Sequence, residues 1–519
     1  MFLRRGLPAI IRLAAPCALY LIVQVRIWQL TVDDAFISFR YAENWARGQG
    51  FVYNAGERVE GYTNFLYTAL IGLLIKLRAD PVLAAKILCI AGGVSALILT
   101  ERLGHLPFPS KASWRLVAPV LLASNAVFVI HTVDGLETSL STALVLLVAL
   151  LSWREFQKPG SVAVSGIVLA AACLTRPDNM LLLPVLLAIA PKAQSEGVHH
   201  KAARRRWLIS FLLLFSAVFV PYYCWRFWFY GHPLPNTFYA KGGGTWHLIH
   251  RGLRSLKLFA AQVTLPVGIL AAAALLKLRQ RRWLLLWCGI VLVKVGFQLW
   301  SGGAWIGRLR FLLPAMPFIY LLAVIGLHDV HRALCLAWRE KGRLIAIAHA
   351  AVALVLIGTL AANLHNSGPL YAEGEKYAAG IASLHIPLGK RLRERAGRAA
   401  ILACQDAGAL PFYSRLRTID LFGLNDAHIA HLPAPYLEQV DLDYVLSRRP
   451  DYMVLNSWSG TGEPFDGTAL VPRLIYADAR FKRDYRLAAL YHGPLYWNWV
   501  FVHAGSPVGP VLLRRARDP

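Results

Sequence analysis

Two adjacent carboxylates, Asp33 and Asp34, follow the first long apolar segment of the chain. A charged group at a membrane boundary costs free energy unless water solvates it or a function uses it. Because neighbouring helical positions point about 100° apart, we expect only one of the two carboxylates to face a reacting group as a general base. The other would position it, cap the helix or bind a divalent cation. The plain structural alternative is an acidic N-cap pair, which the helix dipole favours.

The stretch after this acid pair is polar, aromatic and rich in glycine as far as Asn64. It predicts a structured loop outside the membrane rather than a linker. Together with the acid pair, this loop predicts an active site at the outer membrane face. The substrate-binding candidates in this region are Arg40, Tyr41, Glu60, Tyr62 and Asn64.

A second acidic segment runs from Asp134 to Glu137. It is either a turn that begins a helix or a second carboxylate site that converges on the first. In the second interpretation Glu137 is a catalytic candidate, with Asp134 beside it as a substrate-binding candidate.

Several cations are candidates to bind a phosphate. Arg176, which precedes Asp178 between two apolar runs, snorkels to the interface, binds a phosphate or is the buried partner of an acid. Lys241, Arg308 and Arg310 fall on the predicted outer face, where orientation statistics do not favour cations. We therefore include all of these residues, Asp178 among them, in the predicted substrate site.

The composition predicts an integral membrane protein. Of 519 residues, 56% are hydrophobic, whereas soluble globular chains have about 45–50%. The formal net charge is +26, but the basic residues cluster between apolar runs, which is the pattern of cytoplasmic loops and argues against nucleic-acid binding. The seven cysteines form no C-x-x-C pair, so neither a disulfide framework nor a cysteine-based metal site is expected.

Twelve apolar segments are long enough to be considered as membrane helices. They are 8–30, 65–79, 82–100, 115–131, 138–152, 161–176, 180–191, 207–228, 258–276, 283–300, 311–327 and 344–363. The basic loops place the N-terminus in the cytoplasm, and Asp33, Asp134 and the chain after 364 outside. Parity then requires one segment to be re-entrant, for which we choose 65–79, leaving about eleven crossings.

The pattern changes after residue 364. Apolar strand-like runs at 399–404, 417–422 and 450–455 alternate with helical stretches that start at Gln405 and Asp441. Alternating strands and helices predict a small α/β domain, with Asp406 as a helix cap. We thus expect a multi-pass helical domain over 1–363, including an external loop at 31–64, and an external α/β domain over 364–519.

The residues favour one reaction class. Outside the cytoplasmic membrane there is no supply of nucleotide sugars, so an enzyme there would use a lipid-borne activated group. A polyprenyl-phosphate sugar fits, because its leaving phosphate needs cations and the incoming hydroxyl needs a carboxylate base. No Walker A loop, G-x-S-x-G elbow, H-E-x-x-H or Rossmann glycine run is present in the sequence.

Several motifs together resemble the GT-C glycosyltransferases, and among them the mycobacterial-type terminal arabinofuranosyltransferases. They are Asp33-Asp-Ala-Phe-Ile-Ser-Phe-Arg40-Tyr41, Val59-Glu-Gly-Tyr-Thr-Asn64, Asp134-Gly-Leu-Glu-Thr138, Thr175-Arg-Pro-Asp178, Pro235-Asn236-Thr-Phe-Tyr239-Ala-Lys241, Ser301-Gly-Gly-x-Trp305 and Asp420-Leu-Phe-Gly-Leu-Asn-Asp426. The resemblance adds Asn236 and Tyr239 to the substrate site and favours Asp33 as the base. Ala304 departs from the pattern, since many relatives have an acid there.

The resemblance implies an inverting transferase in a bacterial cytoplasmic membrane. It would move a sugar, arabinofuranose or another pentose, from polyprenyl phosphate to a cell-envelope glycan or glycolipid, in contact with membrane lipids. The alternatives are the same fold acting on protein or lipid A, and a transporter or assembly factor without enzymatic activity. A transporter would have paired broken helices in corresponding halves, and the sequence has no such repeat. A divalent cation at the acid pair is left open.

Overall fold

The computed structural model describes residues 3–158, 161–190, 198–304, 309–339, 341–397, 399–433, 437–458, 465 and 470–506. It divides into two compact units, which are described separately. The helical unit comprises Met1–Trp28, Lys86–Cys224 and Gly243–Ala372, and the mixed unit comprises Gln29–Ala85, Trp225–Gly242 and Glu373–Pro519. The compact units thus group the first loop with the C-terminal region, across more than 300 intervening residues.

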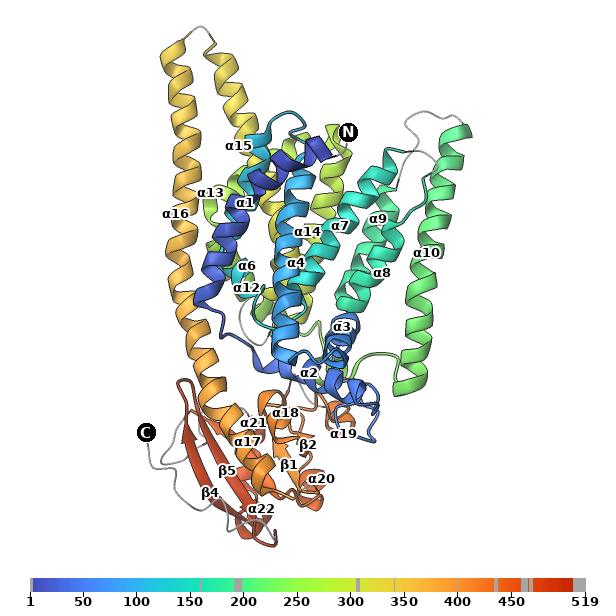
Figure 1. The fold of residues 1–519 in the computed structure, drawn as a ribbon, viewed down its shortest axis with the longest axis vertical. Coiled ribbons are helices and arrows are strands. Elements are labelled where there is room, and N and C mark those ends of the chain that lie inside the picture. The colour runs from blue at the N-terminus through green and yellow to red at the C-terminus, as the bar shows by residue number, and fades with distance from the viewer. Residues whose placement is uncertain are drawn as a thin grey trace. The chain divides into compact units, whose positions relative to one another are not determined.

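The helical unit consists of helices and short 3-10 turns (Figure 1). These are α1 (Leu3–Arg26), α4 (Pro81–Gly104), α5 (Ala112–Ala123), α6 (Ala126–Ile130), α7 (Thr138–Phe156), α8 (Ser165–Thr175), η1 (Pro177–Leu181), α9 (Leu182–Ile189), α10 (Val198–Tyr230), α12 (Trp246–Val263), α13 (Leu265–Ala274), η2 (Leu275–Gln280), α14 (Arg282–Ser301), η3 (Arg310–Ala315), α15 (Met316–Ala337) and α16 (Gly342–Gly380). Parts of α4, α10 and α16 belong to the mixed unit.

Helix α15 forms the core of this unit. In an apolar 18-residue stretch of the span Arg310–Ala337, 83% is buried, whereas the corresponding stretches of Ala202–Tyr230 and Gly342–Arg395 are 17% and 11% buried. Large apolar side chains on the two outer helices are open to the surroundings, with Leu213 64% and Leu354 71% exposed. Contiguous exposed apolar surface of this extent is typical of helices that face lipid, and the chain is a multi-pass membrane protein.

All twelve predicted apolar segments are helical. Six helices are long and apolar enough to cross a bilayer alone, and the pair Trp246–Val263 and Leu265–Leu278, bent by 92°, would make a seventh. The others coincide with the shorter apolar helices Leu13–Arg26, Phe65–Lys76, Ala112–Ala123, Ser165–Thr175 and Pro177–Ile189. At about 1.5 Å per residue, α3 (Phe65–Lys76) is too short for a straight crossing. Its re-entrant placement and the count of eleven crossings stay predictions.

The mixed unit contains the predicted α/β domain. Its remaining elements are α2 (Asp33–Ala46), α11 (Asn236–Lys241), η4 (Ile381–His385), α17 (Ile386–Arg395), β1 (Ile401–Cys404), α18 (Ala409–Ser414), β2 (Arg417–Asp420), α19 (Ala427–Ala430), α20 (Leu442–Ser447), β3 (Tyr452–Ser457), α21 (Leu470–Ala477), α22 (Ala479–Asp484), β4 (Tyr485–His492) and β5 (Trp497–His503). The strand order is β2-β1-β3-β5-β4. The three predicted strands, β1, β2 and β3, are confirmed and pair in parallel.

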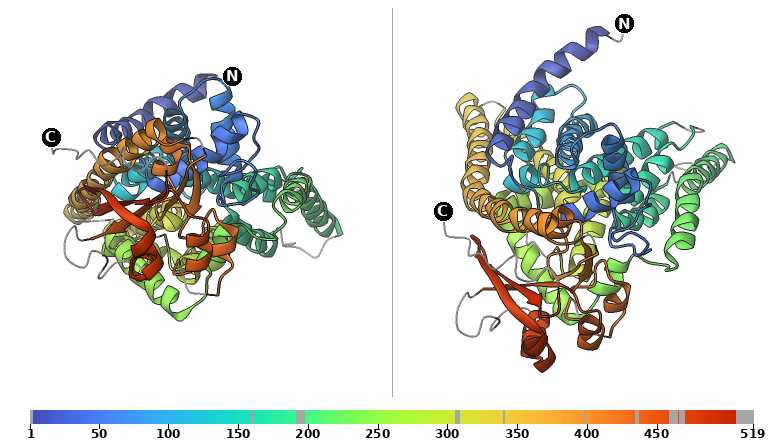
Figure 2. Two further views of the ribbon diagram at one scale, coloured as in Figure 1. Left: turned by 90° about the horizontal axis from the view of Figure 1, so that it is seen from below. Right: turned by 60° about the horizontal axis from the view of Figure 1, so that its bottom comes forward.

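The sheet is buried on both faces because its strands alternate between two apolar layers. Leu402, Val454 and Val500 pack with α17, whereas Ala403, Met453 and Phe501 pack with residues of α20, α21 and α22 on the other face. The antiparallel pair β4–β5, red in both views of Figure 2, completes the sheet and was not predicted. This three-layer arrangement gives the domain its own core.

One local prediction for this domain is wrong. Asp406 was expected to cap the helix after β1, but α18 has Gly408 at its N-cap position and no side-chain cap from its own N-cap residue. Asp406 instead accepts hydrogen bonds from Asn456 Nδ2 at 2.6 Å and Tyr496 Oη at 2.9 Å. The carboxylate that binds the first amides of α18 is Asp33, from the other end of the chain.

Candidate functional site

Asp33 is held by the C-terminal part of the mixed unit. It is the first residue of α2, and its carboxylate oxygens accept hydrogen bonds from the backbone amides of Gly408 at 2.9 Å and Ala409 at 2.8 Å. Gly408 lies so close that a Cβ there would overlap with the Asp33 backbone and side chain. Only glycine therefore permits this contact.

A buried histidine connects Asp33 to a second acid. His385 Nδ1 lies 3.4 Å from Asp33 Oδ1, and its Nε2 lies 3.4 Å from Asp406 Oδ2. Tyr496 Oη lies 2.9 Å from both His385 Nε2 and Asp406 Oδ2. Burial raises the pKa of Asp406, although His385 opposes this shift. His385 thus links the buried Asp33 to the half-buried Asp406.

Asp34 has a different environment from its neighbour. Its side chain is half-buried, and among the described residues it has no hydrogen bond or ion pair. Tyr377 Oη accepts a hydrogen bond at 3.2 Å from the backbone amide of Asp33, at the start of α2. Asp34 is thus the carboxylate of the pair with free acceptor capacity.

The predicted binding residues of the first loop form a hydrogen-bonded framework. Arg40 Nε donates to Tyr53 O at 2.7 Å, and Nη1 donates to Pro411 O at 2.9 Å. Nη2 donates to Leu416 O at 2.7 Å and to Asn54 Oδ1 at 3.0 Å. A further contact at 3.4 Å reaches the Thr418 hydroxyl. Since a guanidinium has five N–H donors, Arg40 binds the first loop to residues 411–418.

The other predicted residues of this loop are similarly engaged. Tyr41 donates to Val59 O at 2.6 Å, Glu60 pairs with Arg226 at 2.6 Å, and Tyr62 Oη lies 3.1 Å from Tyr230 Oη. Burial raises the pKa of Glu60 to about 7. Asn64 Nδ2 donates to Ser38 Oγ at 3.0 Å. These contacts fix the loop around the acid pair.

Residues 236–241, which the sequence suggested as an ordered loop, form the short helix α11. Asn236 Nδ2 donates to Gly423 O at 2.7 Å and Leu424 O at 3.1 Å, and Tyr239 stacks at 4.3 Å on the ring of His431. Lys241 is half-buried and has no hydrogen bond or ion pair within the part of the chain that the structure describes. It is therefore an available cation at the end of a fixed helix.

The segment 420–426 explains why α11 is fixed. Asp420 ends β2 and accepts hydrogen bonds from Phe422 N at 3.0 Å and from Asn425 N and Nδ2 at 2.9 Å. Burial raises the pKa of Asp420 to about 7. This turn presents the carbonyls that bind Asn236, and the side chain of Asn425 lies 3.3 Å from Tyr41 Oη.

The helical unit holds a second charged cluster. Arg176 pairs with Glu137 at 2.8 Å and Asp178 at 2.9 Å, and Lys294 Nζ lies 2.6 Å from Asp178 Oδ2. All four side chains are buried, with Lys294 0% exposed. Lys294 also donates to Asn179 Oδ1 at 2.6 Å. Within this cluster, each acid has a cation.

Of the remaining predicted residues, Arg310 lies next to that cluster, because the Arg176 guanidinium is 4.6 Å from the centroid of the same Phe311 ring that Arg310 contacts. Asp134 accepts a hydrogen bond from His131 Nδ1 at 2.8 Å and one from Leu136 N at 3.0 Å. Arg310 stacks on Phe311 at 5.2 Å, and its buried Nε has no hydrogen-bond partner. Arg308 lies outside the described residues. The acids of the two units, Asp33 and Glu137, belong to separate clusters.

Sequence reasoning missed three side chains of these clusters. Lys294 had a signal, because a lysine within the apolar run 283–300 is costly unless it is paired. His385 had none, and the sequence indicated Asp406 only as a helix cap, because His385 brings Asp33 and Asp406 together only in the folded chain.

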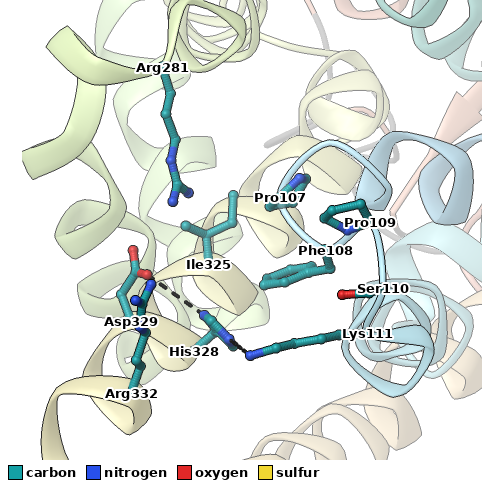
Figure 3. A pocket seen from close by; sticks show the side chains of 10 residues that line it. All are labelled: Pro107, Phe108, Pro109, Ser110, Lys111, Arg281, Ile325, His328, Asp329 and Arg332. Carbon is teal, nitrogen blue, oxygen red and sulfur yellow. Dashed lines mark hydrogen bonds and ion pairs between the residues drawn. The ribbon is translucent and has the colours of Figure 1, made fainter. Parts of the chain in front are cut away.

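One cavity of about 170 Å³ lies in the helical unit and contains none of the predicted site residues. Figure 3 shows the basic side chains Lys111, Arg281 and Arg332 around an apolar floor of Phe108 and Ile325. Lys111 donates to His328 Nε2 at 2.7 Å. This cavity is distinct from both charged clusters described above.

Comparison with known proteins places the fold among membrane glycosyltransferases. The structure of ArnT from Cupriavidus metallidurans bound to undecaprenyl phosphate has a TM-score of 0.58 at 14% identity, covering 96% of this chain and 99% of that chain. The oligosaccharyltransferase of Archaeoglobus fulgidus, in complex with Zn and sulfate, has a TM-score of 0.51 at 11% identity, covering 94% and 72%. The chain therefore has the GT-C fold, as predicted.

The sequence similarity is to one branch of this fold. The terminal β-(1→2)-arabinofuranosyltransferase of Mycobacterium tuberculosis is 27% identical over 237 residues, which are 41% of this chain and 35% of that protein. The match thus spans about a third of the length of that relative. Residues 373–506 match a family model described as a domain of unknown function (DUF8728). The predicted resemblance to GT-C enzymes of the arabinofuranosyltransferase type is confirmed.

Proposed function

We propose that this protein is a glycosyltransferase that moves a sugar from a polyprenyl-phosphate donor to a hydroxyl of a cell-envelope glycan or glycolipid. The observation that carries the proposal is the half-buried, unpartnered carboxylate of Asp34, next to Asp33, which His385 links to Asp406. A general base needs free acceptor capacity, and a carboxylate that already accepts several hydrogen bonds is a weaker base. Asp34 meets this condition better than Asp33.

In this mechanism Asp34 takes the proton of the acceptor hydroxyl. The hydroxyl oxygen forms a bond to the anomeric carbon while the bond from that carbon to the phosphate oxygen breaks, and the phosphate leaves with the bonding electrons. Attack from the side opposite the phosphate inverts the anomeric centre. Asp33 acts as a positioning residue, because its contacts to Gly408 and Ala409 fix the start of α2 and thereby the direction of Asp34.

The leaving phosphate requires fixed cations. Lys241, which belongs to the same compact unit as Asp34, supports this part of the proposal, because it has no hydrogen bond or ion pair among the described residues. Arg176, in contrast, is already paired with Glu137 and Asp178, so we assign it to the framework. ArnT, whose fold is similar, was crystallised with undecaprenyl phosphate, which is the lipid class that we propose here.

The sugar that we propose is a furanosyl pentose, on the strength of the mycobacterial relative. The fold alone does not determine the acceptor, because one scaffold serves several chemistries. For the acid pair, a divalent cation would have to bind mainly through Asp34, since both oxygens of Asp33 accept amide hydrogen bonds. We place the enzyme in a bacterial cytoplasmic membrane, with its N-terminus in the cytoplasm and its α/β domain outside.

The experiment compares Asp34→Asn with Asp33→Asn in the purified full chain, using a polyprenyl-phosphate pentose and extracted envelope glycan. Asp34→Asn should lower kcat by about 10²–10⁴-fold and leave the melting temperature unchanged. Asp33→Asn should lower both, because an amide cannot accept from two backbone N–H groups as the carboxylate does. The exposed Asp443→Asn serves as the control. Full transfer by Asp34→Asn, with loss confined to Asp33→Asn, would return the base role to Asp33.

A further inference from the structure

A group of metal-ligand side chains lies at the α15–α16 hairpin, away from both charged clusters. His331 and Cys335 are one turn apart on α15, and His349 comes from the first turns of α16. Their ligand atoms all lie within 4.8 Å of one another. We propose that these three residues bind a thiophilic divalent metal ion, Zn²⁺ in particular, with water as the fourth ligand.

The spacing fits tetrahedral coordination. Cys335 Sγ and His331 Nε2 are 3.5 Å apart. With Zn–S of about 2.3 Å and Zn–N of about 2.0–2.1 Å, the edge between two such ligands of a tetrahedron is about 3.6 Å. These two residues therefore already span one edge of the site. The ligand atom of His349 lies within 4.8 Å of the other two, which places it within reach of the third position.

The second ring nitrogens support the assignment. His349 Nδ1 donates to the carbonyl oxygen of Ile345 at 2.8 Å, which leaves Nε2 with a lone pair in the neutral ring. Metal-bound histidines commonly donate their other N–H to a carbonyl in this way, which fixes the tautomer and the ring direction. The His331 and His349 rings are 4.7 Å apart at 78°, so they converge on a common point rather than stack.

The neighbouring Lys111 binds a different histidine of α15. Lys111 donates to Nε2 of His328, one turn before His331 on α15 (Figure 3). Trp114 lies against both His328 and His331, at 4.9 Å and 5.9 Å between ring centroids. It thereby covers one side of the His331 ring. The ion would carry a net charge of +1 after coordination of the Cys335 thiolate.

Bound metal would join the two helices of the hairpin, since its ligands come from both α15 and α16. Figure 1 shows these helices side by side at the end of the hairpin. An ion that binds the folded state but not the unfolded chain stabilises the fold by mass action. Zinc should thus raise the melting temperature and protect Cys335 from alkylation.

The test measures metal content of the full chain in detergent, purified with a tag free of histidine. After chelator treatment and dialysis against Zn²⁺, the wild type should retain one ion per chain that Cys335→Ser and His349→Ala lose. Co²⁺ in place of zinc should produce a thiolate charge-transfer band that is absent in Cys335→Ser. The controls Cys224→Ser and His365→Ala should retain the ion.

Two results would overturn the proposal. One is a wild-type chain without bound zinc, and the other is an unchanged zinc content in both ligand variants. Because His349 is exposed, His349→Ala should fold even if Cys335→Ser does not, and gel filtration checks this. The assay does not depend on sugar transfer, so its outcome is independent of the proposed function.

Discussion

At the scale of single residues, the acid pair illustrates how environment separates two neighbouring carboxylates. Asp33 is buried against two backbone amides and a histidine, whereas Asp34 keeps its acceptor capacity. Identical side chains one position apart therefore have different environments. The same reasoning applies to the cations, where paired Arg176 contrasts with unpartnered Lys241.

The lysine leads to a prediction about the donor. Lys241→Ala should raise the apparent KM for the polyprenyl-phosphate sugar about tenfold or more, with little change for the acceptor, because a compact point charge on the phosphate is lost. Initial rates at varied donor and acceptor concentrations measure the split. The exposed Lys257→Ala provides a control of equal charge change. An unchanged donor KM would contradict the assignment of the phosphate to Lys241.

Asp420 leads to a prediction about pH. Its pKa of about 7 in the fold compares with about 3.9 in an unfolded chain. The folded state thus holds a proton that the unfolded chain releases, so this contribution to stability is complete below about pH 4 and disappears as the pH rises towards 7. Melting temperatures of the wild type should fall relative to Asp420→Asn across this window. Parallel curves for the two proteins would contradict the assignment.

At the scale of elements, α14 is tied to η1 through Lys294 and Asp178. Removing one partner of a buried ion pair leaves an uncompensated charge and typically costs about 3–5 kcal/mol. Lys294→Met should therefore lower the melting temperature by several degrees. Adding Asp178→Asn should recover part of the loss, because the stranded carboxylate is removed while Arg176 keeps Glu137.

The control for this pair is Lys257→Met, at an exposed lysine of α12. It removes the same charge without stranding an acid and should leave the melting temperature near that of the wild type. If Lys294→Met behaves like this control, the pair does not contribute to stability. If the double variant is no better than the single, the loss comes from packing rather than from the stranded carboxylate.

The sequence predicted elements where periodicity is strong. All twelve apolar segments are helical, and β1, β2 and β3 lie where apolar runs predicted strands. The sequence did not predict β4, which lies at the edge of the sheet. Its residues Arg486 and Leu487 are both exposed, so β4 lacks the regular alternation of apolar and polar residues that indicates a strand. The segment 236–241, predicted as a loop, is a helix. The side chain of Asn236 at its start donates hydrogen bonds to three backbone carbonyls in the turn at 423–426, which no local sequence pattern indicates.

The candidate site was predictable only in part, because only some of its residues have a local signal in the sequence. The acid pair is visible because two charges next to an apolar run are conspicuous. The partners of Asp33 are not, since Gly408 and His385 are more than 350 residues away along the chain and lack a local signal. Arg40 was read as a substrate ligand, but its contacts with Tyr53, Pro411 and Leu416 can be known only from the fold.

At the scale of the whole molecule, the distribution of basic residues predicts the orientation in the membrane. Reporter fusions at residues 200 and 430 should give opposite signals, with 200 cytoplasmic and 430 external. An alkaline phosphatase fusion and a fluorescent protein fusion at each position measure this in whole cells. Equal signals at the two positions would contradict the proposed orientation. A cytoplasmic signal at 430 would place the α/β domain on the opposite side of the membrane from the proposed polyprenyl-phosphate sugar donor.

The mixed unit can be completed only late in biosynthesis, because it combines residues from both ends of the chain. Arg40 bonds to the carbonyl of Leu416, 376 residues later in the chain. At about 5–20 residues per second, the ribosome needs roughly 20–75 s to make that partner after Arg40 itself. During this interval Asp33 and Arg40 lack their hydrogen-bond partners from the C-terminal region, and the segment that contains them is accessible to proteases and chaperones. A chain terminated before residue 400 lacks these partners permanently. We therefore expect premature termination to lead to rapid degradation rather than to a membrane domain with partial activity.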